Sequence, residues 1–131
     1  MTWSRHRLRS SDDFRAVTRR GGRSARSHVV AHVALFPERP DGPRVGFVVS
    51  KKVGNSVVRH RVTRRLREIF RSHLTQLPGE ASCVLRARPG IQDIPFAQLE
   101  DQVTGALDAA LGACRKRAAG QDRSRERVGR P

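Results

Sequence analysis

Apolar residues recur at helical spacing near the start of the chain. Residues 10–20, SSDDFRAVTRR, place Phe14 and Val17 on one face and predict a short helix. Gly21-Gly22 follows and is expected to end it. Ser10 or Ser11 can cap this helix, and Asp12 and Asp13 suit its positive N-terminal end.

Extended segments are predicted next. Residues 28–36, HVVAHVALF, and 44–50, RVGFVVS, are rich in β-branched residues. The turn sequence PERPDGP joins them, so we expect an antiparallel hairpin. Residues 81–89, ASCVLRARP, predict a further strand that Pro89-Gly90 ends.

A long basic helix is predicted between these strands, with Asn55 as its N-cap and its end before Pro78-Gly79. Its apolar residues fall within about a third of a helical wheel, the width of a core-facing stripe. These residues are Val58, Val62, Leu66, Ile69 and Phe70. The opposite face carries Arg61, Arg64, Arg67 and Arg71.

Pro95 is expected to open a last helix whose apolar stripe packs into the core. The stripe consists of Phe96, Leu99, Val103, Leu107, Ala110, Leu111 and Cys114. Beyond it the chain has no apolar period and carries seven basic against two acidic residues. We therefore predict one domain over residues 1–115 and a basic, disordered tail over residues 116–131.

Charge indicates a polyanionic partner. The net charge is +15 over 131 residues, while 37% of residues are hydrophobic, enough for a core. No apolar run approaches the ~20 residues of a membrane span, and no apolar signal core opens the chain, so we expect a cytoplasmic protein without a membrane partner. Cys83 and Cys114 lack the spacing of a disulfide framework or zinc site and are expected to be buried free thiols.

The basic helix explains much of this charge. Residues 50–73 hold eight Lys or Arg and one acid, Glu68. A merely solvated face usually mixes the two signs, whereas arginine forks of one sign suit phosphate oxygens. Nucleic-acid binding is therefore favoured over a solvated face, with Lys51 and Lys52 extending the surface and Asn55 bringing backbone amides toward a phosphate.

The stretch RVGFVVSKKVGNSVVRHRVTRRLREIFR resembles the signature of the bacterial ribonuclease P protein component. RHRLRSSDDFRAVTRRGGR before it and VLRARPG after it extend the resemblance to about residues 5–115. Three positions depart from the family pattern. His60 stands where asparagine is usual, Thr63 where lysine is usual, and Thr18 where a second aromatic often follows Phe14.

The resemblance implies an α+β fold similar to a ribosomal-protein domain. It would be a small two-layer structure with about four strands, three helices and a left-handed β-α-β crossover. The pattern shows three strands clearly and does not assign the fourth, for which residues 23–27, RSARS, are the candidate segment.

The resemblance also implies a function. The protein would be a subunit of an endoribonuclease that removes the 5′ leader of precursor transfer RNA, while a catalytic RNA performs the chemistry with Mg²⁺ bound mainly by that RNA. Its partners would be the catalytic RNA and the precursor, and no protein partner is implied. RNA-binding residues would be Lys51, Lys52, Asn55, Arg59, His60, Arg61, Arg64 and Arg67; leader-binding residues would be Phe14, Val17 and Thr18.

Catalytic side chains are not predicted in the chain itself. Its acids are scattered, and its five histidines (His6, His28, His32, His60 and His73) lack metal-ligand spacing. His60 and His73 are expected to face solvent or RNA. Two other functions stay open: a ribosomal-protein-like RNA binder, and, less favoured, a DNA-binding repressor, since no helix-turn-helix pair precedes the basic helix.

Overall fold

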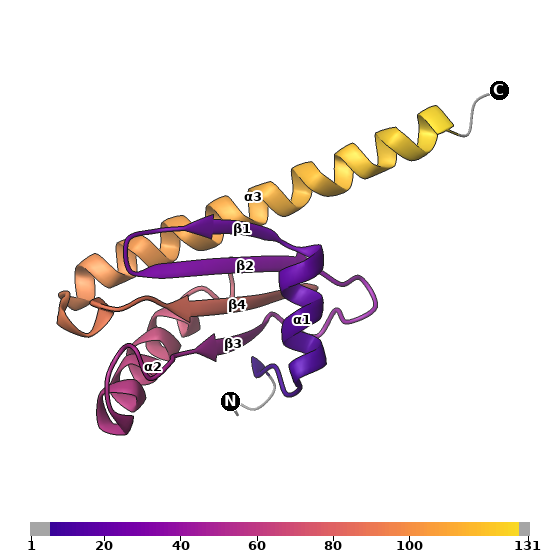
Figure 1. The fold of residues 1–131 in the computed structure, drawn as a ribbon. Coiled ribbons are helices and arrows are strands. Elements are labelled where there is room, and N and C mark those ends of the chain that lie inside the picture. The colour runs from indigo at the N-terminus through magenta and orange to yellow at the C-terminus, as the bar shows by residue number, and fades with distance from the viewer. Residues whose placement is uncertain (1–5, 129–131) are drawn as a thin grey trace.

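The computed structural model describes residues 6–128, with side chains described for residues 6–120. One mixed sheet with strand order β1-β2-β4-β3 forms its centre (Figure 1). The elements in chain order are α1 (Ser11–Arg20), β1 (Gly22–Ala25), β2 (Val29–Leu35), β3 (Arg44–Val48), α2 (Ser56–Arg71), β4 (Ala81–Ala87), the 3₁₀ turn η2 (Ile91–Asp93) and α3 (Phe96–Val128).

β1 supplies the fourth strand, which the sequence pattern left unassigned, and it overlaps the candidate segment 23–27. It pairs antiparallel with β2, and β2 pairs antiparallel with β4 along its whole length. β1 lies tightly against α3: a Cβ on Gly22 would come within 2.1 Å of the Ala110 carbonyl oxygen, so only glycine fits there.

The predicted hairpin between β2 and β3 is wrong. β4 lies between these two strands and pairs parallel with β3, with Val45 opposite Cys83 and Phe47 opposite Leu85. Parallel neighbours need a long crossover, which α2 provides. In Figure 1 both strands run leftward, β4 lies above β3, and α2 lies on the face away from α1; this is the left-handed crossover that the resemblance implies.

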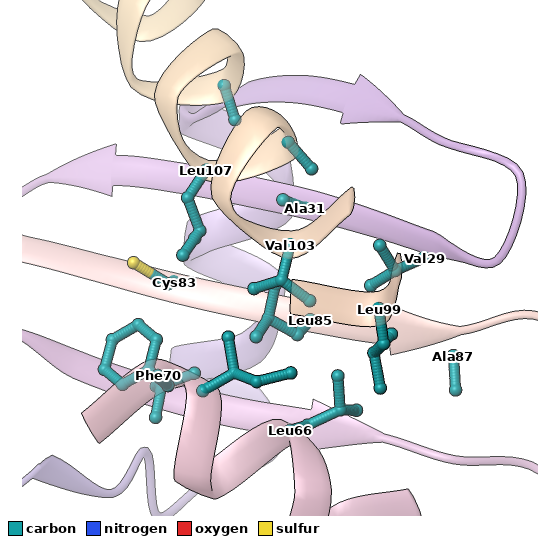
Figure 2. Packing of buried hydrophobic residues seen from close by; sticks show 14 of the residues in the cluster. Val29, Ala31, Leu66, Phe70, Cys83, Leu85, Ala87, Leu99, Val103 and Leu107 are labelled. Atoms are coloured by element: carbon teal, nitrogen blue, oxygen red, sulfur yellow. The ribbon is translucent and has the colours of Figure 1, made fainter. Parts of the chain in front are cut away.

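The larger core lies between the sheet and the helices α2 and α3. Figure 2 shows Leu66 and Phe70 of α2 and Leu99 and Val103 of α3 directed at the inward residues of the sheet, among them Leu85. The predicted stripe of α2 is confirmed: four of its residues are buried and Val58 packs at the edge. Cys83 and Cys114 are buried free thiols, as expected.

α1 covers part of the opposite face of the sheet. Ser10 caps it by accepting from the Asp13 amide at 3.1 Å, and Gly21 ends it. Val17 packs here in a smaller core that also contains Leu8, Ala34, Phe36 and Val84. Helices therefore flank both faces of the sheet in this α+β fold.

α3 extends beyond the sheet. It runs for 33 residues to Val128, into the tail for which the sequence predicted disorder (Figure 1). The apolar stripe ends near Cys114, but the following residues include Ala118 and Ala119 and no proline before Pro131, so local propensity continues the helix where packing has stopped.

His73 is buried rather than facing solvent or RNA. Its Nδ1 lies 2.9 Å from the Ile69 carbonyl oxygen and its Nε2 lies 3.1 Å from the Thr104 hydroxyl. The side chain thus links the end of α2 to α3, because α2 stops just before it and the chain turns inward.

Candidate nucleic-acid interface

The outer face of α2 presents exposed arginines. Asn55 is the N-cap, accepting from the Val58 amide at 3.0 Å, as predicted. Arg61 and Arg64 are exposed, and neither forms an ion pair with another side chain in the described part of the protein. Their charge is therefore available to an external anion such as a phosphate.

Two further predicted arginines face the edge of the sheet. Arg59 and Arg67 lie eight residues apart with Thr63 between them, so all three share one side of α2. Both arginines are half-buried, and the Nε of Arg59 is buried without a hydrogen-bond partner among the described residues. Arg67 therefore does not share the exposed face of Arg61 and Arg64, on which the helical wheel of the sequence places it.

A shallow basic hollow lies at the start of α2. Arg59, His60 and Thr63 line a cavity of about 230 Å³ together with Phe47 and Val49. Lys51 and Lys52 are exposed in the turn that leads into the helix. The structure therefore brings the predicted RNA-binding residues of the turn and of the first two turns of α2 to one end of the molecule.

A second cavity joins α1 to α2. Phe14, Arg67 and Thr63 line a space of about 220 Å³, together with residues of β3 and of the segment before α1. Two arginines of that segment, Arg7 and Arg9, also line it. An aromatic ring and several cations around one hollow suit a single-stranded nucleic acid, whose bases stack and whose phosphates need positive charge.

The position of the Phe14 ring depends on Gly46 of β3. A Cβ at Gly46 would come within 2.2 Å of Phe14 Cζ, so the glycine lets the end of the ring pack against the strand. Phe14 is only half-buried, and it lines the cavity.

The other predicted leader residues are placed differently. Val17 is 1% exposed, so it packs under α1 and has no surface for a leader; the helical face that placed it beside Phe14 points it into the sheet. Thr18 is exposed, and its hydroxyl donates to the Phe14 and Arg15 carbonyl oxygens of its own helix.

The sheet beyond α1 carries polar residues that the sequence had not indicated. His32 of β2 is half-buried and lies opposite Arg23 of β1 and Val84 of β4. Burial, and then the charges of Arg23 and Arg86, lower the pKa of His32. Its Nδ1 is buried and has no hydrogen-bond partner in the described part of the chain.

Strand alternation could have indicated these residues. In HVVAHVALF, His32 occupies an outward position of an apolar strand, and strand residues two apart share a face. The predicted hairpin pairs β2 with β3 and so leaves β4 aside. The nearness of Arg86 of β4 to His32 of β2 therefore does not follow from the sequence pattern.

Acidic residues near this surface are paired with arginines. Asp13 accepts from Arg39 at 3.0 Å, and this hydrogen bond is the main reason that the pKa of Asp13 is lowered. Asp12 lies 4.0 Å from Arg15.

Within the described residues, no group of three or more His, Cys, Asp and Glu side chains could hold a metal ion. In the same part of the chain, no helix combines the length and the apolar composition that a membrane span needs.

Known proteins share both the sequence and the fold. The family model for ribonuclease P matches residues 3–111. The ribonuclease P protein component of Mycobacterium sp. (strain KMS) is 42% identical over 107 residues, covering 82% of this chain and 91% of the relative. That of Streptomyces griseus is 43% identical over 114 residues, covering 82% and 93%.

Solved structures agree. A Staphylococcus aureus RNase P protein superposes with a TM-score of 0.71 at 26% identity, covering 79% of this chain and 93% of that one. The RNase P protein from Thermotoga maritima, at 23% identity and a TM-score of 0.66, shares the fold, with 77% and 94% covered. With its fold, basic helix and sequence in agreement, the chain belongs to the ribonuclease P protein family.

Proposed function

We propose that this protein binds a catalytic ribonuclease P RNA through α2 and the 5′ leader of precursor transfer RNA through the hollow beside Phe14. It thereby assists removal of the leader to give the mature 5′ end. The observation that carries the proposal is the cavity that joins Phe14 of α1 to Arg67 of α2. A chain threaded through it would pass from an aromatic ring to the arginines of the basic helix.

The surface of α2 is suited to a folded RNA. Arg61 and Arg64 project outward without ion-pair partners in the described structure, so each can bind a phosphate oxygen. Lys51 and Lys52 extend this charge around the start of the helix. Such interactions neutralise phosphates and release counterions, which makes binding strongly dependent on salt.

The hollow beside Phe14 is suited to a single strand. Phe14 offers a half-buried aromatic ring, Arg7 and Arg9 offer charge, and the half-buried His32 lies on the adjoining sheet. Bases of any sequence can stack on an aromatic ring, so this surface would tolerate many leader sequences. Thr18 leaves less aromatic surface than a second ring would.

The protein's contribution to the reaction is positioning and charge. Asp12 and Asp13 are acids of α1 near the hollow, and both lie beside arginines. The described residues do not form a donor set for Mg²⁺, so we assign the ion to the RNA subunit and the hydrolysis to the holoenzyme. Fixed arginine charge near the RNA would replace part of the cation screening that the RNA otherwise needs.

Reconstitution tests the proposal. The full-length protein is mixed with a bacterial ribonuclease P RNA and end-labelled precursor at low Mg²⁺, where the RNA alone is slow. We expect correct 5′ cleavage to appear with the protein and none with the protein alone. Cleavage by RNA-free protein that EDTA abolishes would contradict the assignment of chemistry to the RNA, and no stimulation at any Mg²⁺ concentration would contradict the subunit role.

A further inference from the structure

A third cationic hollow lies away from both surfaces described above, where α1 ends and α3 leaves the sheet. Its volume is about 230 Å³. Figure 1 shows this end of α1 beside α3 at the β1 edge of the sheet, on the other side of the molecule from α2. We propose that this hollow, the α1–α3 pocket, is a further RNA-binding site that takes a backbone phosphate. Its lining residues are Arg19, Arg20, Leu35, Cys114, Arg117 and Ala118.

Arg117 is held in place by the end of α1. Its Nη1 donates to the Arg19 carbonyl oxygen at 3.1 Å and to the Gly21 carbonyl oxygen at 3.3 Å. A guanidinium has five N–H donors, so these two bonds through one nitrogen leave donors for a ligand. Because the fork is already oriented, less side-chain entropy is lost when an anion binds.

Arg20 is also positioned before any ligand arrives. Its guanidinium carbon lies 4.5 Å from the centre of the Phe36 ring. Its acidic neighbour Glu38 lies 3.9 Å away, and both side chains are more than half exposed, so this ion pair is weak. Stacking fixes the plane of the guanidinium and leaves its edge available for hydrogen bonding.

Arg19 completes the positive rim. It is exposed and makes no side-chain hydrogen bond or ion pair with the other described side chains. The floor is apolar, formed by Leu35, Cys114 and Ala118. Three guanidiniums over an apolar floor match a phosphodiester, which presents two charged oxygens and less polar sugar carbons.

RNA is favoured over an acidic peptide because the chain belongs to a family of RNA-associated subunits. The arginine fork fits carboxylate and phosphate oxygens alike, so the choice of RNA comes from the family. The assignment to RNA therefore rests on the proposed function, whereas binding of an anion to the pocket does not. Either the catalytic RNA or the precursor could supply the phosphate.

The first experiment uses the full-length protein and inorganic phosphate. Phosphate is titrated while NMR follows the arginine Nε–Hε signals and the backbone amides near Gly21. We expect saturable shifts at Arg19, Arg20 and Arg117, and loss of this response in Arg19→Ala/Arg117→Ala. The control Arg15→Ala/Arg115→Ala removes the same charge from the same two helices outside the pocket, and it should keep the response.

The second experiment measures the salt dependence of affinity for two RNAs: the ribonuclease P RNA with protein alone, and the precursor with the holoenzyme. Arg19→Ala/Arg117→Ala should lower the slope of log affinity against log salt by about 0.7–0.9, because one phosphate is no longer neutralised. The decrease should appear for whichever of the two RNAs supplies that phosphate. The control variant should lower the slope less. If Arg117→Ala impairs folding, Arg19→Ala alone tests the site, since its side chain makes no described hydrogen bond or ion pair.

The outcomes are distinct. A response confined to α2, or unsaturable shifts at the pocket, would overturn the proposal. Saturable phosphate binding with unchanged slopes in both arms would overturn the assignment to RNA and favour an acidic protein partner. If the wild-type protein binds neither RNA, the proposed function itself is contradicted. This result comes from the wild type alone, so it is distinguishable from a failure of the pocket.

Discussion

The two faces of the sheet differ in how completely they are covered. On one face α2 and α3 bury a continuous apolar layer that includes Leu66, Phe70 and Leu107, each at most 1% exposed. On the other face α1 covers only one part, and beyond it Arg23, His32 and Arg86 lie on an open surface. The first face contributes most of the buried core, and the second leaves basic side chains exposed beyond the smaller core.

The two faces can differ in this way because core packing and exposure to a ligand fall mostly on different residues. Buried apolar surface contributes about 25 cal/mol per Å², and a domain of this size can draw most of it from one face. Phe14 combines the two: it packs against the smaller core and also borders the hollow between α1 and α2. Substitutions on the two faces should therefore separate stability from RNA binding.

The largest effect is expected from the covered face. Leu66→Ala removes a fully buried side chain between α2 and the sheet and should cost about 2–5 kcal/mol of unfolding free energy. Arg86→Ala on the open face should change it by less than about 0.5 kcal/mol, as for most surface positions. Urea unfolding of both variants checks the comparison, and equal costs would show that the open face is structural.

The next effect concerns RNA affinity without stability. Arg61→Ala/Arg64→Ala should lower the slope of log affinity against log salt by about 1.4–1.8, because each phosphate that an arginine neutralises adds about 0.7–0.9 to that slope. Binding of the ribonuclease P RNA at several salt concentrations measures this.

Arg65→Ala is the matched control on the same helix. Arg65 donates to the Ile94 carbonyl oxygen at 3.1 Å and faces Phe96 at the start of α3. Arg65→Ala should therefore lower the stability more than the substitutions at Arg61 and Arg64 do. It should lower the slope of log affinity against log salt less. Equal slopes for the double variant and the wild type, with native circular dichroism, would show that the outer face of α2 is merely solvated.

The smallest effect is a titration on the open face. His32 should titrate below its usual pKa of 6.5, because burial and then Arg23 and Arg86 disfavour the imidazolium. Since the folded pKa is lowered, the protein is most stable above about pH 6.5 with respect to this group, and that stability is lost as the pH falls through the folded pKa. NMR of the imidazole protons measures the pKa.

Arg86→Ala should raise the pKa of His32 while leaving it below 6.5, because burial is the larger cause. A wild-type pKa above 6.5 would contradict the described environment. Phosphate groups bound beside His32 should raise its pKa, so adding a leader oligonucleotide sharpens the same measurement.

The sequence predicted local structure better than strand pairing. The caps Ser10 and Asn55 and the apolar stripe of α2 follow from local rules, and the structure agrees with them. The order of β2, β3 and β4 does not, because nearness in sequence favours a hairpin, whereas the parallel pair depends on α2 packing against the sheet.

The parts of the candidate site that depend on residue composition or on a local motif could be predicted from the sequence. The exposed charge of Arg61 and Arg64 could be read from the wheel. The direction of Arg67 toward Phe14 could not, since it depends on how α2 sits beside β3. His73 was misplaced for a similar reason: its burial depends on contact with α3, which no local pattern contains.

Phe14→Ala tests the central claim, that the partly covered face binds the leader. Affinity of the holoenzyme is measured for precursor with a leader of several nucleotides and for mature transfer RNA, with thermal unfolding of the protein beside them. Stacking is worth about 1–3 kcal/mol per base, so precursor affinity should fall roughly 5- to 150-fold while mature transfer RNA affinity stays nearly unchanged. Gly46→Ala, which would crowd the ring without removing it, should act in the same direction. Equal losses for the two RNAs in both variants would contradict the claim.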